Sequence, residues 1–243
     1  THARRERSMS TVTGICPSAG EAENAMRALE AHGFEHRQLN LLARGETSFP
    51  VHAKQAGAAL GGYLGLSAAT LIPGLGPVLG MGKLASGLIG VALGTAAGAA
   101  VGRHTHGIPN EDLYFYEEAL RDGRAVVLVD ARDATQETQA RNLIERAGGR
   151  PVGATRREWW QAVRQGEREH LHSLGRRLEP IEEGYRSGFE AALHPTTRGR
   201  EYDQVADYVE TCYPGPCRSE EFRAGYERGQ DYFRRRNAAR EAE

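Results

Sequence analysis

Hydrophobic and polar positions follow a strand–helix–strand pattern at the start of the chain. Residues 9–16, MSTVTGIC, alternate and are rich in β-branched side chains, which predicts a strand. Residues 17–34 carry an apolar stripe on one helical face, and Ser18 and Glu21 have the spacing of a capping box, so we expect a helix there. Residues 37–44, RQLNLLAR, predict a second strand.

A similar order returns further along. Residues 109–123 predict a helix, 124–132 a strongly apolar strand of a central sheet, 133–149 a helix, and 150–154 a short last strand. Without residues 45–123 the order is β-α-β-β-α-β, the arrangement of a ferredoxin-like domain. We therefore expect an α+β fold, with residues 10–45 and 107–154 forming the ferredoxin-like domain and residues 1–9 a disordered tail.

The segment between these halves, residues 46–106, has a different composition. From Gln55 to Gly102 its single charge is Lys83, and glycine recurs at every fourth position in two runs. A Pro- and Gly-rich turn near 73–77 separates the runs, which predicts a helical hairpin with arms at about 54–72 and 78–102. The glycines expected at the packing faces of this glycine zipper are Gly57, Gly61, Gly65, Gly90, Gly94, Gly98 and Gly102.

Two surroundings suit such a hairpin. An arm of about 19 residues rises roughly 28 Å, close to the hydrocarbon thickness of a bilayer. Lys54 precedes the first arm and Arg103 follows the second, as expected for a hairpin that enters a membrane from the cytoplasm. Alternatively, hairpins from several chains bury one another's apolar faces in a soluble homo-oligomer. Both interpretations predict insertion or assembly rather than an isolated monomer.

Residues 155–243 lack strand signals and predict an all-helical C-terminal region. Helices are expected near 157–179, 180–193, 201–212 and 219–239. Two of them share the motif Gly-Tyr-x-x-Gly, whose glycines lie on one helical face and allow another backbone to approach. We expect these two helices to cross tightly, although two unrelated helices that share a short motif remain an alternative. The residues expected at the crossing are Gly184, Tyr185, Gly188, Gly225, Tyr226 and Gly229.

Three cysteines offer the main candidate chemistry. Cys16 ends a strand just before a helix, where a helix N-terminus can lower a thiol pKa, but a buried strand-end cysteine is the plainer interpretation. Cys212 and Cys217 flank YPGP and could close a small disulfide loop or remain two thiols. A metal site at this pair would need further ligands, and no nearby histidine supplies them.

The other motifs do not combine into a set of catalytic residues. The histidine pairs at 104 and 106 and at 170 and 172 do not share a helical face, so neither has ligand spacing. Trp159 and Trp160 could touch a membrane or a neighbouring domain, or pack in a core. A net charge of −1 gives no reason to expect nucleic acid as a partner. We predict no enzyme, no cofactor and no metal.

The sequence also resembles a known family. The stretches TVTGICPSAGEAENAMRALEAHGF, the glycine hairpin and HGIPNEDLYFYEEALRDGRAVVLV together resemble the bacterial general stress protein 17M-like family, also labelled low-temperature-induced proteins, over about residues 10–153. The resemblance implies a small α/β domain with a glycine-zipper hairpin, linked to stress responses and bringing no catalytic residues. Cys16 departs from the family pattern, in which an apolar or aromatic residue is usual.

These observations give two functional hypotheses. The first is a non-enzymatic, stress-related structural protein that self-assembles or inserts in a membrane through its glycine hairpin. The second is a scaffold or membrane-anchoring accessory subunit whose C-terminal helices hold a protein partner. We expect the protein in the cytoplasm or at the cytoplasmic face of the inner membrane, because no secretion signal is visible at its start.

Overall fold

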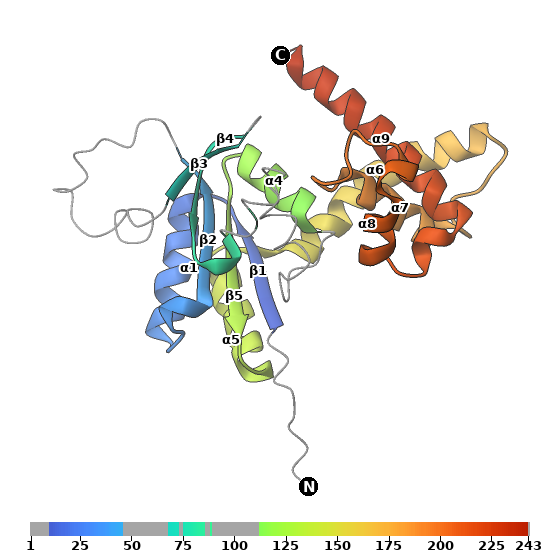
Figure 1. Cartoon of the computed structure of the whole chain (residues 1–243). Helices are drawn as coiled ribbons and strands as arrows, with labels where there is room; N and C mark the ends of the chain where they lie inside the picture. Colours follow the sequence, from blue (N-terminus) through green and yellow to red (C-terminus); the bar gives the residue numbers. More distant parts are fainter. Residues whose placement is uncertain (1–9, 46–67, 73–74, 86–87, 89–111, 243) are drawn as a thin grey trace, which may run out of the picture. The chain divides into compact units, whose positions relative to one another are not determined.

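The computed structural model describes residues 10–45, 68–72, 75–85, 88 and 112–242 (Figure 1). The chain divides into two compact units, Thr1–Arg156 and Arg157–Glu243. The first contains an antiparallel sheet with helices, and the described part of the second is helical, so the fold is α+β.

One antiparallel sheet organises the first unit, with the strand order β3-β4-β2-β5-β1-β6. At its centre β5 pairs with β1 on one side, Val12 opposite Val129, and with β2 on the other, Leu41 opposite Val127. The strands are β1 (Ser10–Cys16), β2 (Leu39–Arg44), β3 (Ala68–Ile72), β4 (Gly76–Met81), β5 (Ala125–Ala131) and β6 (Arg150–Pro151).

Side-chain alternation decides which helices cover which face of this sheet. Helices α1 (Ala19–Ala31) and α5 (Ala134–Arg146) share a buried cluster with one set of alternate strand positions, which includes Val127 and Val129 of β5. The other set, which includes Leu42 and Val126, is also buried, and α4 (Leu113–Arg121) packs on β2 and β5 (Figure 1). Because both faces of β5 are covered, its sequence is continuously apolar.

Local sequence signals set the ends of these helices. The Ser18 hydroxyl caps α1 by accepting from the Glu21 backbone N–H, and the Asp133 carboxylate caps α5 by accepting from Gln136 N–H at 2.8 Å. A 3₁₀ turn, His36–Gln38, leads into β2. Helices α1 and α5 therefore start at their polar capping residues.

The expected helical hairpin is wrong at two described stretches, whereas residues 83–85 and 88 of its second arm are helical as expected. Ala68–Ile72 and Gly76–Met81 are strands β3 and β4, paired with each other, and β4 extends the sheet along β2. Pairing satisfies the backbone groups along this side of β2, and Met81 is buried in the core. Periodicity alone does not distinguish a helix from a strand in short apolar runs between Pro and Gly. Here pairing with the edge of β2 makes the run a strand.

The glycine-zipper positions lie elsewhere. Gly57, Gly61, Gly65, Gly90, Gly94, Gly98 and Gly102 all fall outside the described residues, as does the expected tail 1–9. Lys83, in contrast, is described: its ammonium group lies close enough to Asp130 of β5 to oppose the rise in that carboxyl's pKa caused by burial. Within the described ranges, no helix combines the length and apolarity needed to cross a bilayer.

Four helices build the second unit. Helix α6 (Val152–Ser173) begins in the first unit and continues into the second, and α7 (Glu182–Leu193), α8 (Tyr202–Cys212) and α9 (Glu220–Glu241) follow, with a 3₁₀ turn at Pro216–Arg218. The expected last strand at 150–154 is only two residues long, because Val152 already belongs to α6. Ser219 caps α9 through the Phe222 backbone N–H.

The contact between β1 and α5 in the first unit depends on a glycine. A Cβ added at Gly14 would overlap Cγ2 of Ile144, which is almost fully buried. We expect Gly14→Ala to lower the free energy of unfolding of the first unit by about 1–3 kcal/mol, and Ile144→Leu, which removes Cγ2, to recover much of this loss. Hydrogen exchange of the β1 and β5 amides measures the effect.

The control for this prediction is Gly20→Ala in α1. A Cβ there would meet only the Ser18 hydroxyl oxygen, at an ordinary 3.6 Å, so this variant should be neutral or slightly stabilising. Equal destabilisation by both alanines, or no recovery with Ile144→Leu, would show that the close approach of β1 to α5 has been misassigned.

Candidate functional site

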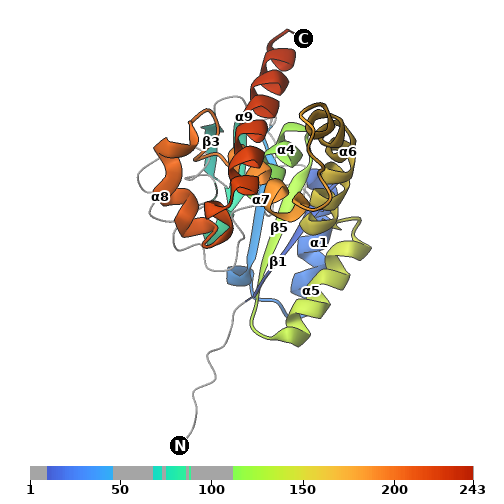
Figure 2. The ribbon, with the colours of Figure 1, turned by 90° about the vertical axis from the view of Figure 1, so that its right-hand side faces the viewer.

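Helices α7 and α9 cross with their backbones in direct contact, at the two Gly-Tyr-x-x-Gly motifs. They pack together along the second unit (Figure 2). A Cβ on Gly188 would overlap the carbonyl oxygen of Phe222, and a Cβ on Gly225 would overlap the carbonyl oxygen of Tyr185. Each glycine thus leaves room for the backbone of the partner helix, in the arrangement that favours Cα–H···O contacts.

The outer glycines of the two motifs are less crowded. A Cβ on Gly229 would lie 2.6 Å from the Phe189 carbonyl oxygen, and one on Gly184 would lie 3.3 Å from Cβ of Glu221. The structure therefore brings all four motif glycines to one helix pair, and Gly188 and Gly225 mark the point of closest approach.

Tyr185 anchors the crossing to α6. Its hydroxyl donates to Oε2 of Glu167 at 2.8 Å, and the same oxygen accepts from Nε of Arg228 at 2.8 Å. All three side chains are largely buried, and burial followed by the Glu167 carboxylate raises the pKa of Tyr185. Removing Glu167 or Arg228 would leave a buried charge without its partner, which is costly, and the network as a whole connects three helices.

Tyr226 secures the opposite side, the turn at residues 194–200. Its hydroxyl is within hydrogen-bond distance of the carbonyl oxygens of Thr197 (3.1 Å) and Arg200 (3.0 Å), and burial raises its pKa to about 12. Gln230, one turn along α9, donates to the Ala192 and Thr197 carbonyls and accepts from Gly199 N–H at 2.7 Å. The two motif tyrosines are therefore structural hydroxyls.

An aromatic cluster around Phe189 fills the space between α6, α7 and α9. Its ring centroid lies 5.8 Å from Trp159, 5.9 Å from Trp160 and 5.4 Å from Tyr232. Trp160 is buried and Trp159 partly exposed, and Nε1 of Trp160 donates to Glu182 at 2.9 Å. Trp160 therefore packs in this unit's core and Trp159 at its edge, in agreement with the sequence interpretation of core packing.

The Glu182 carboxylate ties the start of α7 to α6. Arg164 donates to it twice, at 2.7 Å from Nε and 2.6 Å from the terminal nitrogen. Hydrogen bonds from Arg164, and then from Trp160, lower the pKa of Glu182 to about 2 despite partial burial. This charge-assisted pair is ionised throughout the neutral range.

A shallow hollow lies between α8 and α9. Its volume is about 320 Å³, and charged side chains of both signs line it. Asp203 pairs with Arg223, whose guanidinium also stacks 4.6 Å from the Tyr202 ring centre, and Asp231 pairs with Arg234. The lining residues are Glu201, Tyr202, Asp203, Arg223, Tyr226, Glu227, Gln230, Asp231 and Arg234.

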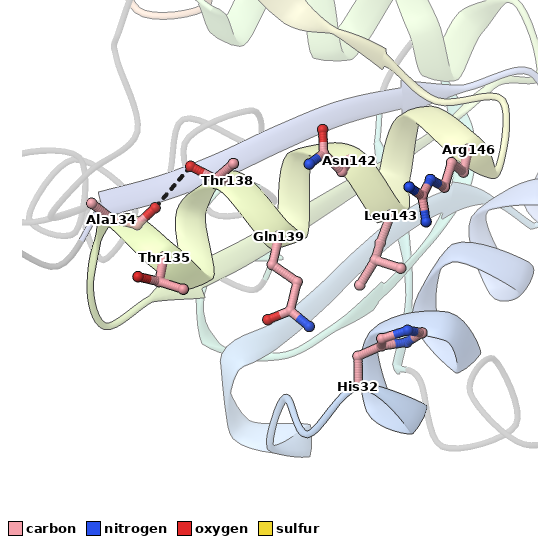
Figure 3. Close-up of a pocket in the computed structure, with 8 residues that line it drawn as sticks. All are labelled: His32, Ala134, Thr135, Thr138, Gln139, Asn142, Leu143 and Arg146. Atoms are coloured by element: carbon pink, nitrogen blue, oxygen red, sulfur yellow. Dashed lines mark hydrogen bonds between the residues drawn. The ribbon is translucent and has the colours of Figure 1, made fainter.

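A second, more open groove of about 620 Å³ lies on the first unit, between the end of α1 and α5 (Figure 3). Its lining includes hydroxyl and amide groups beside apolar surface, with Thr138 donating to the Ala134 carbonyl at 2.9 Å. His32 faces it from α1, and its Nδ1 lies 2.7 Å from the Ala28 carbonyl oxygen. The groove offers hydrogen bonds but brings no nucleophile together with a general base.

The cysteines do not form a reactive centre. Cys16 is fully buried, and burial, followed by the charge of Glu21, raises the pKa of its thiol to about 12, so the hypothesis of a reactive thiolate is wrong. Cys212 and Cys217 remain thiols rather than a disulfide. In the part of the chain that the structure describes, no three histidine, cysteine or carboxylate side chains gather as a metal site.

Sequence reasoning missed three side chains that hold this unit together: Glu167, His194 and Gln230. Each is almost fully buried although its residue type favours solvent. His194 directly follows the apolar run at the end of α7, which was a usable signal. For Glu167 and Gln230 the sequence shows only charged and polar helix positions.

Comparison of the chain with models of protein families, with curated proteins and with solved structures finds no match.

The closeness of α7 and α9 can be tested by adding single methyl groups. We expect Gly188→Ala and Gly225→Ala each to lower the free energy of unfolding of the second unit by about 2–3 kcal/mol or more, because the helices must separate. Fluorescence of the chain's two tryptophans, both near this crossing, reports the urea midpoint of this unit.

Gly166→Ala in α6 is the matched control. Nothing lies within 4 Å of a Cβ at that position, so the variant should gain about 0.5–1 kcal/mol from better helix propensity. Midpoints for Gly188→Ala and Gly225→Ala as high as that of Gly166→Ala would contradict the close crossing.

Proposed function

We propose that the protein is a non-enzymatic structural protein. The observation that carries this proposal is that the buried polar side chains of the second unit form hydrogen bonds with other parts of the protein. Tyr185, Tyr226 and Glu167 hold helices and turns together, and their hydrogen bonds go to protein groups rather than to open space. Reactive groups serving a substrate would instead converge on a cleft.

We further propose that the first unit is a ferredoxin-like domain with residues 46–106 inserted between its second and third core strands. The order β2-β5-β1-β6, antiparallel throughout, supports this proposal. In it β3 and β4 belong to the insertion and widen the sheet beyond β2.

The glycine repeats at 57–65 and 90–102 are the proposed means of self-assembly or membrane insertion. Four-residue glycine spacing suits close backbone packing, and the α7–α9 crossing shows the same spacing at work in this chain. Because of the resemblance to stress proteins, we propose that this structural role belongs to a stress response. The proposed location is the cytoplasm or the cytoplasmic face of the inner membrane.

A second candidate function is a scaffold whose C-terminal helices hold a protein partner. The hollow between α8 and α9 favours it, because charged side chains of both signs surround the partly exposed Tyr202 there. Tyrosine and arginine are enriched at the centres of protein interfaces. The rigid crossing beneath the hollow would present these side chains with little loss of conformational entropy on binding.

Self-assembly is tested by changing one glycine of the second run. Gly94→Leu should shift the full-length protein to a smaller assembly, because a leucine side chain separates the packed helices, whereas Gly94→Ala should retain most of the assembly. Size-exclusion chromatography with light scattering, in detergent for any membrane fraction, gives the mass. Equal masses for the wild type and Gly94→Leu would contradict the proposal.

The scaffold function is tested by placing a photo-crosslinking amino acid at Glu227, an exposed position lining the hollow. Irradiation in cells should give a discrete adduct with one other polypeptide. The same amino acid at Glu169, exposed on α6, is the control and should give none. Identical adduct patterns at both positions, or adducts at neither, would count against a partner in the hollow.

A further inference from the structure

The turn at residues 194–200, between α7 and α8, is built around a buried histidine. His194 is only 2% exposed and caps the C-terminus of α7. Its Nδ1 accepts a hydrogen bond from the Thr196 backbone N–H at 3.0 Å, and the Tyr208 hydroxyl on α8 lies 3.1 Å from Nε2 and 3.3 Å from Nδ1. One imidazole therefore connects the end of α7, the turn and α8.

This geometry requires a neutral ring. An N–H group can donate to Nδ1 only while that nitrogen carries no proton, so Nε2 holds the single ring proton and faces Tyr208. Protonation would place an N–H on Nδ1 opposite the Thr196 N–H. The turn would lose this hydrogen bond, and two donors would face each other at a buried position.

The groups around the ring do not favour a charged imidazole. Arg198, in the same turn, adds to the effect of burial, and together they lower the pKa of His194 to about 3. From α8 the ring faces Tyr208, whose hydroxyl neighbours Cys212, and burial raises the pKa of that tyrosine. On α7 the nearest carboxylate along the chain, Glu190, is already paired with Arg186 at 2.6 Å.

Opening of the turn can be measured through its backbone amides. Five consecutive backbone N–H groups donate within it: Thr196 to the His194 ring, Thr197 and Arg198 to the His194 carbonyl, Gly199 to Gln230, and Arg200 to the Thr197 carbonyl. On α9, Tyr226 and Gln230 face the turn, and neither changes charge between pH 5 and 7.

We propose that residues 194–200 form an acid-released latch, in which protonation of His194 opens the turn and frees Tyr208 of α8 while the crossing of α7 and α9 stays closed. The proposal goes beyond the structural role proposed above and does not depend on it. The crossing stays closed because its contacts are backbone-to-backbone and contain no histidine.

The direction of the pH effect follows from the two states of the ring. The pKa of His194 is lower in the closed turn than its ordinary value of 6.5, so the closed form is fully favoured above pH 6.5 and loses stability as pH falls towards 3. Well below pH 6.5 the opening constant should rise about tenfold per pH unit, and the whole change between pH 7.5 and 5.0 should be roughly 30-fold.

Hydrogen exchange on the full-length protein between pH 7.5 and 5.0, corrected for the intrinsic pH dependence of amide exchange, tests the latch. The amides of 196–200 should lose protection by about 30-fold between pH 7.5 and 5.0, while amides in the middle of α7 and α9 keep theirs. Unchanged protection of 196–200, or equal loss across α7 and α9, would overturn the proposal.

Two variants make the assignment specific. In His194→Gln the side-chain oxygen can still accept from Thr196 N–H but does not titrate, so the pH dependence at 196–200 should disappear. His172→Gln, which removes an exposed histidine of α6, is the matched control and should retain it. A separate NMR titration of the His194 ring in the unmodified protein tests the latch without any variant, which could misfold. If the ring protonates near pH 6.5 while the amides of 196–200 stay protected, the latch proposal is also overturned.

Discussion

The second unit depends on one constraint, the backbone contact between α7 and α9 at Gly188 and Gly225. Neither position has room for even a methyl group, and the contact fixes how the two helices cross. Once the crossing is set, Tyr185 is positioned to reach Glu167 on α6, and Tyr226 to reach the 194–200 turn. The aromatic cluster around Phe189 then fills the space between α6, α7 and α9.

Glycine in a helix lowers helix propensity, so its repeated use needs an offsetting gain. At the crossing the gain comes from dispersion and Cα–H···O contacts between backbones, and from buried side chains that the short distance brings together. Gly166 of α6 shows the contrast, because no neighbouring atom approaches it and nothing in the described structure offsets its cost. Helical glycines in this chain therefore serve packing at some positions and not at others, and only the structure separates the two.

The sequence predicted those elements whose signals are local. Strands β1, β2 and β5 and helices α1 and α5 were expected from periodicity and, for α1, from the cap at Ser18, and the α+β class followed from them. The helix expected over 68–72 and 78–81 was wrong, because β4 pairs with the distant strand β2 and β3 then pairs with β4. The Gly-Tyr-x-x-Gly pair was visible as a repeat, but Glu167 and Gln230 were not, since their burial depends on tertiary packing.

The account is tested most directly by NMR on the full-length protein, through nuclear Overhauser effects between the Hα protons of Gly188 and the backbone amide proton of Tyr226. A Cβ at Gly188 would lie 2.9 Å from the Tyr226 nitrogen, so the two backbones are within range. Strong cross-peaks from Gly188 to α9 and from Gly225 to α7 are expected. Side-chain contacts between α7 and α9 without these backbone cross-peaks would mean that the helices lie further apart, and the crossing could not be what organises the unit.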